Sequence, residues 1–395
     1  MPAGDGVRFE LLSGHDGGPR LGRLWIGELA VPTPAFMPVG TRATVKTLDS
    51  EILQEIGARL ILANTYHLFL RPGAERIARL GGLHRFMSWP GGILTDSGGF
   101  QVHSLAEFRE IRPDGIEFRS HLDGTRHFLT PEAILEIQAR LGSDIRMVLD
   151  VCTSQPAALS ETARDMELTL RWAERSREAW TAQARPGAAE PGGAGERRAG
   201  SAGAALFAIV QGGTFPELRR ACARRLVSLG FDGYALGGFS VGEPVEARPA
   251  ALEAALAELP RERPRYLMGV GTPEDILDAV GLGVDLFDCV LPTRNARKAT
   301  VFTWKGKMIV KNSAFAEDPR PLDPDCPCAA CRRYSRAYLR HLFQVGEQLA
   351  GRLATIHSLA FYQQLMAGIR EALAAGRYAD FAREARARMT RGAQA

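Results

Sequence analysis

Two aspartates follow apolar runs that read as β-strands, and their surroundings suggest chemistry. Asp96 stands in "GGILTDSG" and Asp288 in "VDLFDCVLPTRNAR". Burying an unpaired carboxylate is expensive, so neither is ordinary core filling, although each alone could be a structural cap or a hydrogen-bonded strut. As a pair, one carboxylate could attack an anomeric carbon while the other moves protons, as in retaining glycoside chemistry.

Further polar groups end two other apolar runs. Asp150 and Gln211 can read the donor and acceptor edge of a planar nitrogen heterocycle, since a carboxylate accepts two N–H groups of a guanine-like edge and an amide answers a carbonyl or ring nitrogen. In "DSGGF", the small residues 97–99 would let a flat ligand approach the backbone. Phe100 could lie against its ring, although core packing would also explain this side chain.

Three cysteines within six positions point to a metal. Cys326, Cys328 and Cys331 have the spacing C-x-C-x2-C, and six cysteines in 395 residues do not suggest a disulfide scaffold. His357, in a helical pattern 26 positions after the last cysteine, is the expected fourth ligand, with His341 as the competing imidazole. Such a set predicts a closed, structural zinc site, against free buried cysteines or an iron–sulfur site.

The positive charge is concentrated in one segment. Net charge is only +4, yet the segment 294–340 carries eleven Lys and Arg against four acids, an excess of seven positive charges. A local basic surface suits a polyanion such as nucleic acid, and a solvated basic face is the alternative. The arginines of "TRNAR", Arg294 and Arg297, could hold phosphates beside Asp288 and keep that carboxylate ionised.

Near-continuous apolar runs alternate with helix-period segments. Such runs, separated by helices, indicate a parallel sheet covered on both faces. Eight of them fit a (β/α)8 TIM barrel better than the alternative, an open doubly wound sheet, and catalytic groups of such barrels sit at the C-terminal strand ends. The eight predicted strands are 34–40, 59–66, 91–98, 144–152, 206–213, 233–242, 265–271 and 284–292.

Two stretches depart from this repeat. Residues 105–130 alternate in polarity between turn signals, which predicts an inserted antiparallel hairpin or small sheet. Residues 182–204 contain no aromatic or large aliphatic side chain, which predicts a disordered loop. We therefore expect a barrel over 1–300, a zinc-binding subdomain over 301–360 and C-terminal helices packing on the barrel over 361–395. No segment resembles a signal peptide or a membrane span, so we expect a cytoplasmic protein.

Taken together, these residues resemble one family. The segments "TDSGGFQV", "SDIRMVLDVCT", "IVQGG", "GYALGGFSVGE", "YLMGVGTPED", "FDCVLPTRNAR" and "CPCAACRRYSRAYL…TIH" are similar to those of bacterial-type tRNA-guanine transglycosylases, in order from about residue 7 to about residue 375. The resemblance implies a zinc-containing TIM barrel that exchanges the guanine at the anticodon wobble position for a 7-deazaguanine on the queuosine pathway, with no redox cofactor or ATP.

The resemblance also implies roles for individual residues. Asp288 would be the nucleophile at ribose C1′ and Asp96 the general acid/base. The base would be bound by Asp96, Ser97, Gly98, Gly99, Phe100, Asp150, Gln211 and Gly238. The anticodon loop would be contacted by Gly269, Val270, Gly271, Thr272, Pro273, Glu274, Asp275, Thr293, Arg294, Asn295, Ala296 and Arg297. Zinc would be held by Cys326, Cys328, Cys331 and His357.

The chain departs from the family pattern at three places. The family usually has a carboxylate after the aspartate of the fourth strand, where this chain has Val151, so queuine or another deazaguanine is an alternative to the 7-aminomethyl base. Glu243 could still support the aminomethyl group through the backbone near Phe239. "TRNARKA" replaces the usual "TRNARNG", and the 182–204 insertion is extra.

The resemblance further implies a homodimer with the zinc subdomain at the contact. Tyr334, Tyr338 and His341 fall on one helix face, which suits an interface or intramolecular packing equally. Two other functions compete. A zinc-dependent nucleobase deaminase needs an H-x-E motif, which the sequence lacks. A non-catalytic RNA-binding subunit would lack part of the catalytic set, whereas both aspartates are present.

Overall fold

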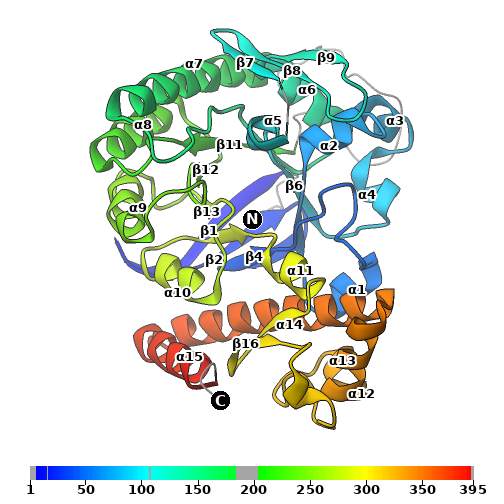
Figure 1. Cartoon of the computed structure of the whole chain (residues 1–395). Helices are drawn as coiled ribbons and strands as arrows, with labels where there is room; N and C mark the ends of the chain where they lie inside the picture. The colour runs from blue at the N-terminus through cyan, green and yellow to red at the C-terminus, as the bar shows by residue number, and fades with distance from the viewer. Residues whose placement is uncertain (1–5, 16, 106–107, 184–202, 393–395) are drawn as a thin grey trace.

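The computed structural model describes residues 6–15, 17–105, 108–183 and 203–392. An eight-stranded parallel sheet forms its centre (Figure 1), with the strand order β4-β14-β13-β12-β11-β10-β6-β5. Its strands are β4 (Ala35–Met37), β5 (Leu60–Ala63), β6 (Gly92–Thr95), β10 (Ile145–Met147), β11 (Ala205–Val210), β12 (Gly233–Leu236), β13 (Arg265–Leu267) and β14 (Leu286–Asp288).

The two edge strands of this sheet approach each other and almost close it into a barrel. A parallel bridge joins Val39, just beyond β4, to Leu62 of β5. The Leu62 N–H donates to the Pro38 carbonyl at 3.0 Å, and the Leu62 carbonyl accepts from Gly40 N–H at 2.6 Å. Since every residue of the eight strands is buried, the apolar runs needed cover on both faces. The predicted TIM barrel is therefore confirmed, and the open sheet is excluded.

Helices between the strands cover the outside of the barrel (Figure 1). They are α1 (Ser50–Glu55), α2 (Thr65–Leu70), α3 (Ala74–Arg79), α4 (Gly82–Met87), α5 (Gly99–Leu105), α6 (Pro131–Leu141), α7 (Leu159–Gln183), α8 (Pro216–Leu229), α9 (Arg248–Leu256), α10 (Pro273–Gly281) and α11 (Leu291–Ala296), with a 3-10 turn, η1 (Val245–Ala247).

Their boundaries follow local sequence signals. The Thr130 side chain caps α6 by accepting from Ala133 N–H, Pro131 opens the helix, and Gly142 ends it with a left-handed backbone.

The barrel strands are shorter than the apolar runs that predicted them. The third run reaches residue 98, yet β6 ends at Thr95, and the second run includes Thr65, which already begins α2. At these ends the backbone leaves the strand ladder because side chains of the barrel mouth take over its hydrogen bonds; Thr65 N–H, for example, donates to the Asp96 carboxylate. The extra residues of each run are therefore mouth loops that keep an apolar composition.

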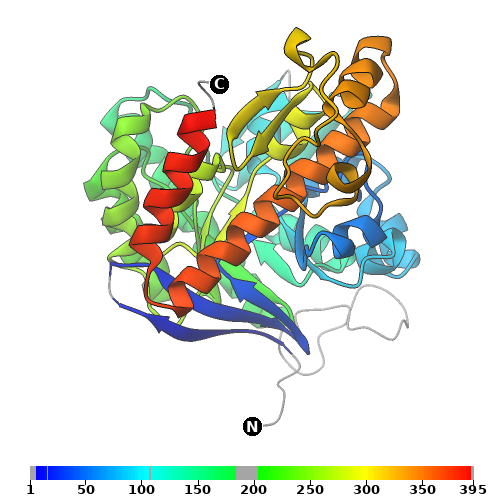
Figure 2. The same cartoon turned by 90° about the horizontal axis from the view of Figure 1, so that it is seen from below.

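Two small antiparallel sheets flank the barrel. The stretch 105–130 holds the predicted insertion as a three-stranded sheet of β7 (Arg109–Arg112), β8 (Gly115–Arg119) and β9 (Arg126–Leu129). A second sheet, which the sequence reading did not foresee, consists of β1 (Val7–Gly14), β2 (Arg20–Ile26) and β3 (Leu29–Thr33). It lies along one end of the barrel, on the side away from β15 and β16 (Figure 2). Of the predicted disordered loop 182–204, residues 184–202 lie outside the described part.

The C-terminal region combines a hairpin with helices. Its elements are β15 (Thr300–Thr303), β16 (Gly306–Ile309), the 3-10 turn η2 (Ser313–Phe315), α12 (Ala329–Arg333), α13 (Arg336–Val345), α14 (Gln348–Ala374) and α15 (Tyr378–Gly392).

The long helix α14 ties this region to the barrel. Gln363 donates to the Phe36 carbonyl at 3.1 Å, and Arg370 to the Pro34 carbonyl at 2.8 Å. No helix in the described part of the chain combines the length and hydropathy needed to span a membrane.

Candidate active site and metal centre

Asp96 and Asp288 lie at the same mouth of the barrel. Asp96 directly follows β6, and Asp288 is the last residue of β14. Both carboxylates are buried, with 6% and 8% of each residue exposed. The charge of Asp288 contributes to raising the pKa of Asp96, and both charges contribute to raising the pKa of the Tyr266 hydroxyl. Parallel strands thus bring together two acids that are 192 positions apart in the sequence.

The Asp96 carboxylate is held by the loop after β5. Thr65 N–H donates to its Oδ1 at 2.8 Å, and the Asn64 side-chain amide donates to its Oδ2. Burial raises the pKa of Asp96 to about 7, against the opposing effect of these two hydrogen bonds. A carboxyl group with this pKa exchanges a proton near neutrality, which is the property that a general acid/base needs.

The Asp288 carboxylate is oriented through one of its two oxygens. The Tyr266 hydroxyl donates to Oδ1 at 2.6 Å, and Gly269 N–H donates to the same atom at 2.8 Å. Among the described residues, both hydrogen bonds to this carboxylate thus go to Oδ1 and none to Oδ2. Burial raises the pKa of Asp288, and the hydrogen bonds from Tyr266 and Gly269 oppose this rise.

The expectation that the arginines of "TRNAR" keep Asp288 ionised is therefore corrected. The groups that lower its pKa are a tyrosine and a backbone amide. Arg294 is exposed, and Arg297 donates to the Thr293 carbonyl at 2.8 Å within its own helix. Because solvent screens an exposed guanidinium, its charge acts weakly on a buried carboxylate.

Asp150 and Gln211 form the polar floor of a pocket beside this pair. Gln211 Nε2 donates to Asp150 Oδ2 at 2.7 Å, and the Ser97 hydroxyl donates to Asp150 Oδ1 at 2.9 Å. Burial raises the pKa of Asp150, while the contacts from Gln211 and Ser97 lower it. Each carboxylate oxygen keeps a lone pair, so the group can still accept N–H donors from a ligand.

Glycines are required at the edge of this pocket. A Cβ on Gly99 would lie 2.8 Å from the Asp150 carbonyl oxygen. Gly238 has a φ of +70°, and a Cβ there would lie 2.4 Å from the Gln211 side-chain oxygen. Neither position therefore tolerates a side chain. Gly98 and Phe100 complete the segment, and Phe100 is 46% exposed at the start of α5, which excludes core packing as its main role.

A small cavity extends behind the pocket floor. It lies between the Asp150–Cys152 segment and the inserted sheet, where Arg109, Ile111 and Ile116 line it. Val151, which stands where a carboxylate was expected, also lines this cavity and is 2% exposed. The wall behind Asp150 thus combines apolar side chains with the cationic Arg109.

The predicted RNA-contacting segments differ in exposure. In the loop after β13 and the start of α10, Gly269 and Glu274 are exposed and Thr272 and Asp275 are half-buried, while in α11 Arg294 is exposed. Asn295 and Arg297 are half-buried as well. The side chains of the remaining predicted positions are buried or absent and face the protein; these are Val270, Gly271, Pro273, Thr293 and Ala296.

Four buried side chains converge in the C-terminal region. The ligand atoms of Cys326, Cys328, Cys331 and His357 all lie within 4.8 Å of one another, a geometry that could hold a metal ion. The fourth group is therefore His357, whereas His341 is exposed on α13. His357 Nε2 donates to the Phe302 carbonyl at 3.0 Å, which turns Nδ1 toward the Cys331 sulfur at 3.2 Å.

Sequence reasoning missed three residues that orient the acidic pair. Asn64 and Thr65 follow β5 as Asp96 follows β6, so the strand-end rule applied to every strand would have found them. Tyr266 lies inside β13, and no local pattern separates it from a core tyrosine.

Comparisons with known proteins agree in pointing to one family. Residues 16–391 match the family model described as queuine tRNA-ribosyltransferase. The chain is 52% identical over 365 residues to the queuine tRNA-ribosyltransferase of Thermoanaerobacter pseudethanolicus, with 92% of each chain covered. It is 53% identical over 359 residues to that of Syntrophobacter fumaroxidans, covering 91% of each, and 49% identical over 385 residues to that of Zymomonas mobilis, covering 97% and 96%.

Proposed function

Because the chain belongs to the queuine tRNA-ribosyltransferase family and is thus a transferase acting on tRNA guanosine, we propose which exchange it performs and how. The guanine at the wobble position of tRNAs with GUN anticodons is replaced by a 7-deazaguanine, most readily 7-aminomethyl-7-deazaguanine, in queuosine biosynthesis. One observation carries this proposal: two buried carboxylates share a barrel mouth beside a floor of polar groups suited to a guanine edge.

The proposed reaction proceeds through a glycosyl–aspartate ester. Asp288 Oδ2 attacks ribose C1′, the bond from C1′ to the guanine ring nitrogen breaks, and its electron pair leaves with the base. Asp96, protonated near neutrality, gives the departing guanine a proton. The incoming base then returns a proton to Asp96 and attacks C1′, which releases Asp288. One glycosidic bond replaces another, so no cofactor is consumed.

The proposed recognition of the base uses the pocket floor and its glycine edges. Asp150 accepts hydrogen bonds from the N–H groups of the guanine-like edge. Gln211 and the Gly238 backbone donate hydrogen bonds to the carbonyl of the base, and residues 97–100 form the pocket wall. Glu243, which accepts Ser240 N–H at 2.7 Å and Val241 N–H at 2.9 Å, supports the aminomethyl group through the backbone near Phe239.

Queuine is the second candidate base. Val151 favours it, since a buried apolar side chain stands where a second carboxylate would select a cationic substituent.

Mass spectrometry of unmodified tRNA incubated with the protein and each candidate base tests this proposal. We expect the mass of the wobble nucleoside to change with 7-aminomethyl-7-deazaguanine. Incorporation of labelled guanine into the same tRNA is the control that separates an inactive protein from one that rejects the supplied base. Failure of every base, including guanine, would favour a non-catalytic RNA-binding subunit instead.

Arg294 is proposed to bind a phosphate of the anticodon loop. We expect Arg294→Ala to weaken tRNA binding by about 1–3 kcal/mol, by analogy with arginine contacts in nucleic-acid complexes, and to reduce the salt dependence of binding. Filter binding at several salt concentrations measures both quantities. Arg220→Ala on α8 removes an equally exposed arginine from the outer helices and is the matched control. Equal affinity and salt slope in both variants would contradict the phosphate contact.

The metal centre is proposed to hold one structural zinc ion. Three thiolates and an imidazole make a closed tetrahedral set, and a bound zinc would contribute folding free energy there rather than an open catalytic position.

Cys328→Ser is expected to lower the zinc content to well below one per chain and to destabilise the C-terminal region. Metal analysis and hydrogen exchange of residues 300–360 measure these effects. Cys222→Ser, a buried cysteine of α8, is the matched control and should keep the metal. Full metal occupancy of Cys328→Ser would refute the ligand assignment.

The oligomeric state, the cellular location and the domain boundaries also remain proposals. A homodimer would use the surface formed by Tyr334 and Tyr338, whose ring centroids stack at 5.4 Å. The expected single helix face is corrected, because Tyr334 follows α12 in an extended conformation and only Tyr338 and His341 lie on α13. A cytoplasmic location follows from the proposed tRNA substrate. We also keep the division at 300 and 360, although the second boundary falls within α14, so a continuous helix joins the last two parts.

A further inference from the structure

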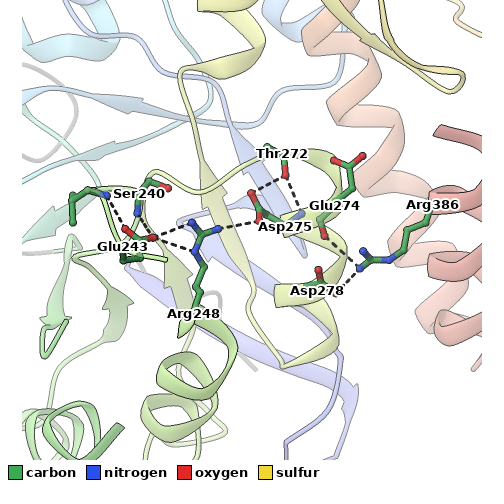
Figure 3. Close-up of polar contacts among 9 residues, drawn as sticks. Ser240, Glu243, Arg248, Thr272, Glu274, Asp275, Asp278 and Arg386 are labelled. Atoms are coloured by element: carbon green, nitrogen blue, oxygen red, sulfur yellow. Dashed lines mark hydrogen bonds and ion pairs between the residues drawn. The ribbon is translucent and has the colours of Figure 1, made fainter. Parts of the chain in front are cut away.

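Arg248, the first residue of α9, bridges two loops of the barrel mouth (Figure 3). Its Nε and Nη2 donate to Glu243 Oε1 at 3.2 and 2.9 Å, and its Nη1 donates to Asp275 Oδ1 at 3.0 Å. The arginine side chain is only 11% exposed. A guanidinium can serve two carboxylates at once because its donors point in fixed, diverging directions, which the single ammonium of a lysine cannot copy.

The Glu243 end of this bridge belongs to the loop of the base pocket. Its side chain is 1% exposed and accepts the N–H groups of Ser240 and Val241. These peptides follow Gly238 directly, at the pocket edge. Although burial opposes it, the backbone donors and Arg248 together lower the pKa of Glu243. Glu243 thus stays an acceptor that fixes how these peptides are turned.

The Asp275 end lies in the first turn of α10, directly after the loop that contacts Asp288. Asp275 Oδ2 accepts from the Thr272 hydroxyl at 2.7 Å, and its N–H donates back to that hydroxyl at 3.2 Å, which caps α10. Thr272 closes the loop in which Gly269 N–H donates to the Asp288 carboxylate. Tyr362 further fixes this loop by donating to the Gly271 carbonyl at 2.6 Å.

We propose that Arg248 is a positioning residue that sets the distance between the base-binding loop and the loop that orients Asp288. The bridge would keep a base bound at Gly238 in line with the C1′ atom that Asp288 attacks. This inference rests on the proposed base exchange. It predicts that the two loops loosen together when Arg248 is lost, although neither contains that residue.

The structure supplies a control arginine that pairs with the same helix, α10. Arg386 of α15 donates to Asp278 of α10 at 2.5 Å and to the Glu274 carbonyl at 3.4 Å (Figure 3). Arg386 therefore connects α10 to the C-terminal helix α15, and it does not contact the base-binding loop. Arg386→Met thus removes another, more exposed arginine ion pair of α10 without breaking the bridge.

The test compares Arg248→Met, Arg248→Lys and Arg386→Met in the full chain. We expect Arg248→Met to lower kcat/KM for guanine in the tRNA exchange assay about tenfold or more, through both a raised KM and a lowered kcat, because small displacements of reacting groups are costly. Arg248→Lys should recover little of the loss. Arg386→Met should stay within about twofold of the wild type, since that ion pair lies outside the bridge.

Hydrogen exchange separates this inference from the proposed function. In Arg248→Met, peptides covering 238–243 and 268–275 should both exchange faster, whether or not the wild type exchanges guanine. In Arg386→Met, the first of these peptides should remain unchanged. Loosening of only one loop in Arg248→Met, or equal kinetic losses in Arg248→Met and Arg386→Met, would overturn the positioning role. If the wild type did not exchange guanine but both peptides exchanged hydrogen faster in Arg248→Met, the base-exchange function alone would be overturned.

Discussion

Asp288→Ala is expected to abolish base exchange and to remove any denaturant-resistant adduct between the protein and tRNA. Tyr266 and Gly269 both donate to Oδ1 of this buried carboxylate, which leaves Oδ2 as the oxygen of the proposed attack. Loss of a nucleophile of this kind costs a factor of about 10⁴–10⁶ in kcat in well-studied enzymes. Incorporation of labelled guanine into tRNA measures the exchange, and a denaturing gel of protein incubated with tRNA detects the adduct.

A second variant separates chemistry from folding. Alanine leaves the Tyr266 hydroxyl and Gly269 N–H without their acceptor, a penalty of about 1–3 kcal/mol for each buried group. Asp288→Asn keeps one acceptor oxygen at that position, removes the charge and replaces the other oxygen with an NH2 group, so it should fold and still be inactive. Asp380→Asn on the exposed face of α15 is the control for the substitution itself. Exchange retained by both Asp288 variants would exclude this residue as the nucleophile.

Adduct formation from tRNA alone is expected to slow as the pH rises through about 7, and this dependence should vanish in Asp96→Asn. Burial raises the pKa of Asp96 to about 7, so below this pH the group is protonated and can give a proton to the departing guanine. Above it the group is ionised and cannot act as the acid. Removing a general acid should also slow the step by a factor of about 10²–10⁴.

The opposite limb of the pH profile belongs to Asp288. Its pKa is also raised by burial, so at low pH it becomes protonated and loses its nucleophilic form. The wild type should therefore show a bell-shaped profile whose two limbs belong to the coupled pair. A single-turnover series on both sides of pH 7 records it. If the falling limb persisted in Asp96→Asn, the proton donor would be a different group.

The strands and the acidic residues of the mouth could be read from the sequence, but the closure of the barrel could not. Eight apolar runs fit a barrel or an open sheet, and the choice depends on the pairing of Val39 with Leu62, two residues that no local pattern connects. Similarly, Asp96 was found because it ends an apolar run, whereas Tyr266 was missed because it lies within one.

At the candidate metal site, too, sequence spacing identified some of the ligands, but only the fold identified the rest. The C-x-C-x2-C spacing identified the cysteines, but two histidines competed for the fourth position. The fold decides between them because α14 returns past α12 and brings His357 to the thiols, while His341 stays in solvent. The bridging role of Arg248 was not predicted either. Its two partners, Glu243 and Asp275, lie in different segments, and only the fold brings both of them to its side chain.

The helix α14 connects the candidate metal site with the loop beside Asp288. His357 joins the cysteine cluster, and Tyr362, little more than one turn later, donates to the Gly271 carbonyl in the loop beside Asp288. If this cluster holds the proposed zinc ion, a chelator that removes it is therefore expected to lower the exchange activity before the barrel unfolds. A structural ion would then affect the exchange rate without contacting the substrate, by fixing the position of the loop beside Asp288.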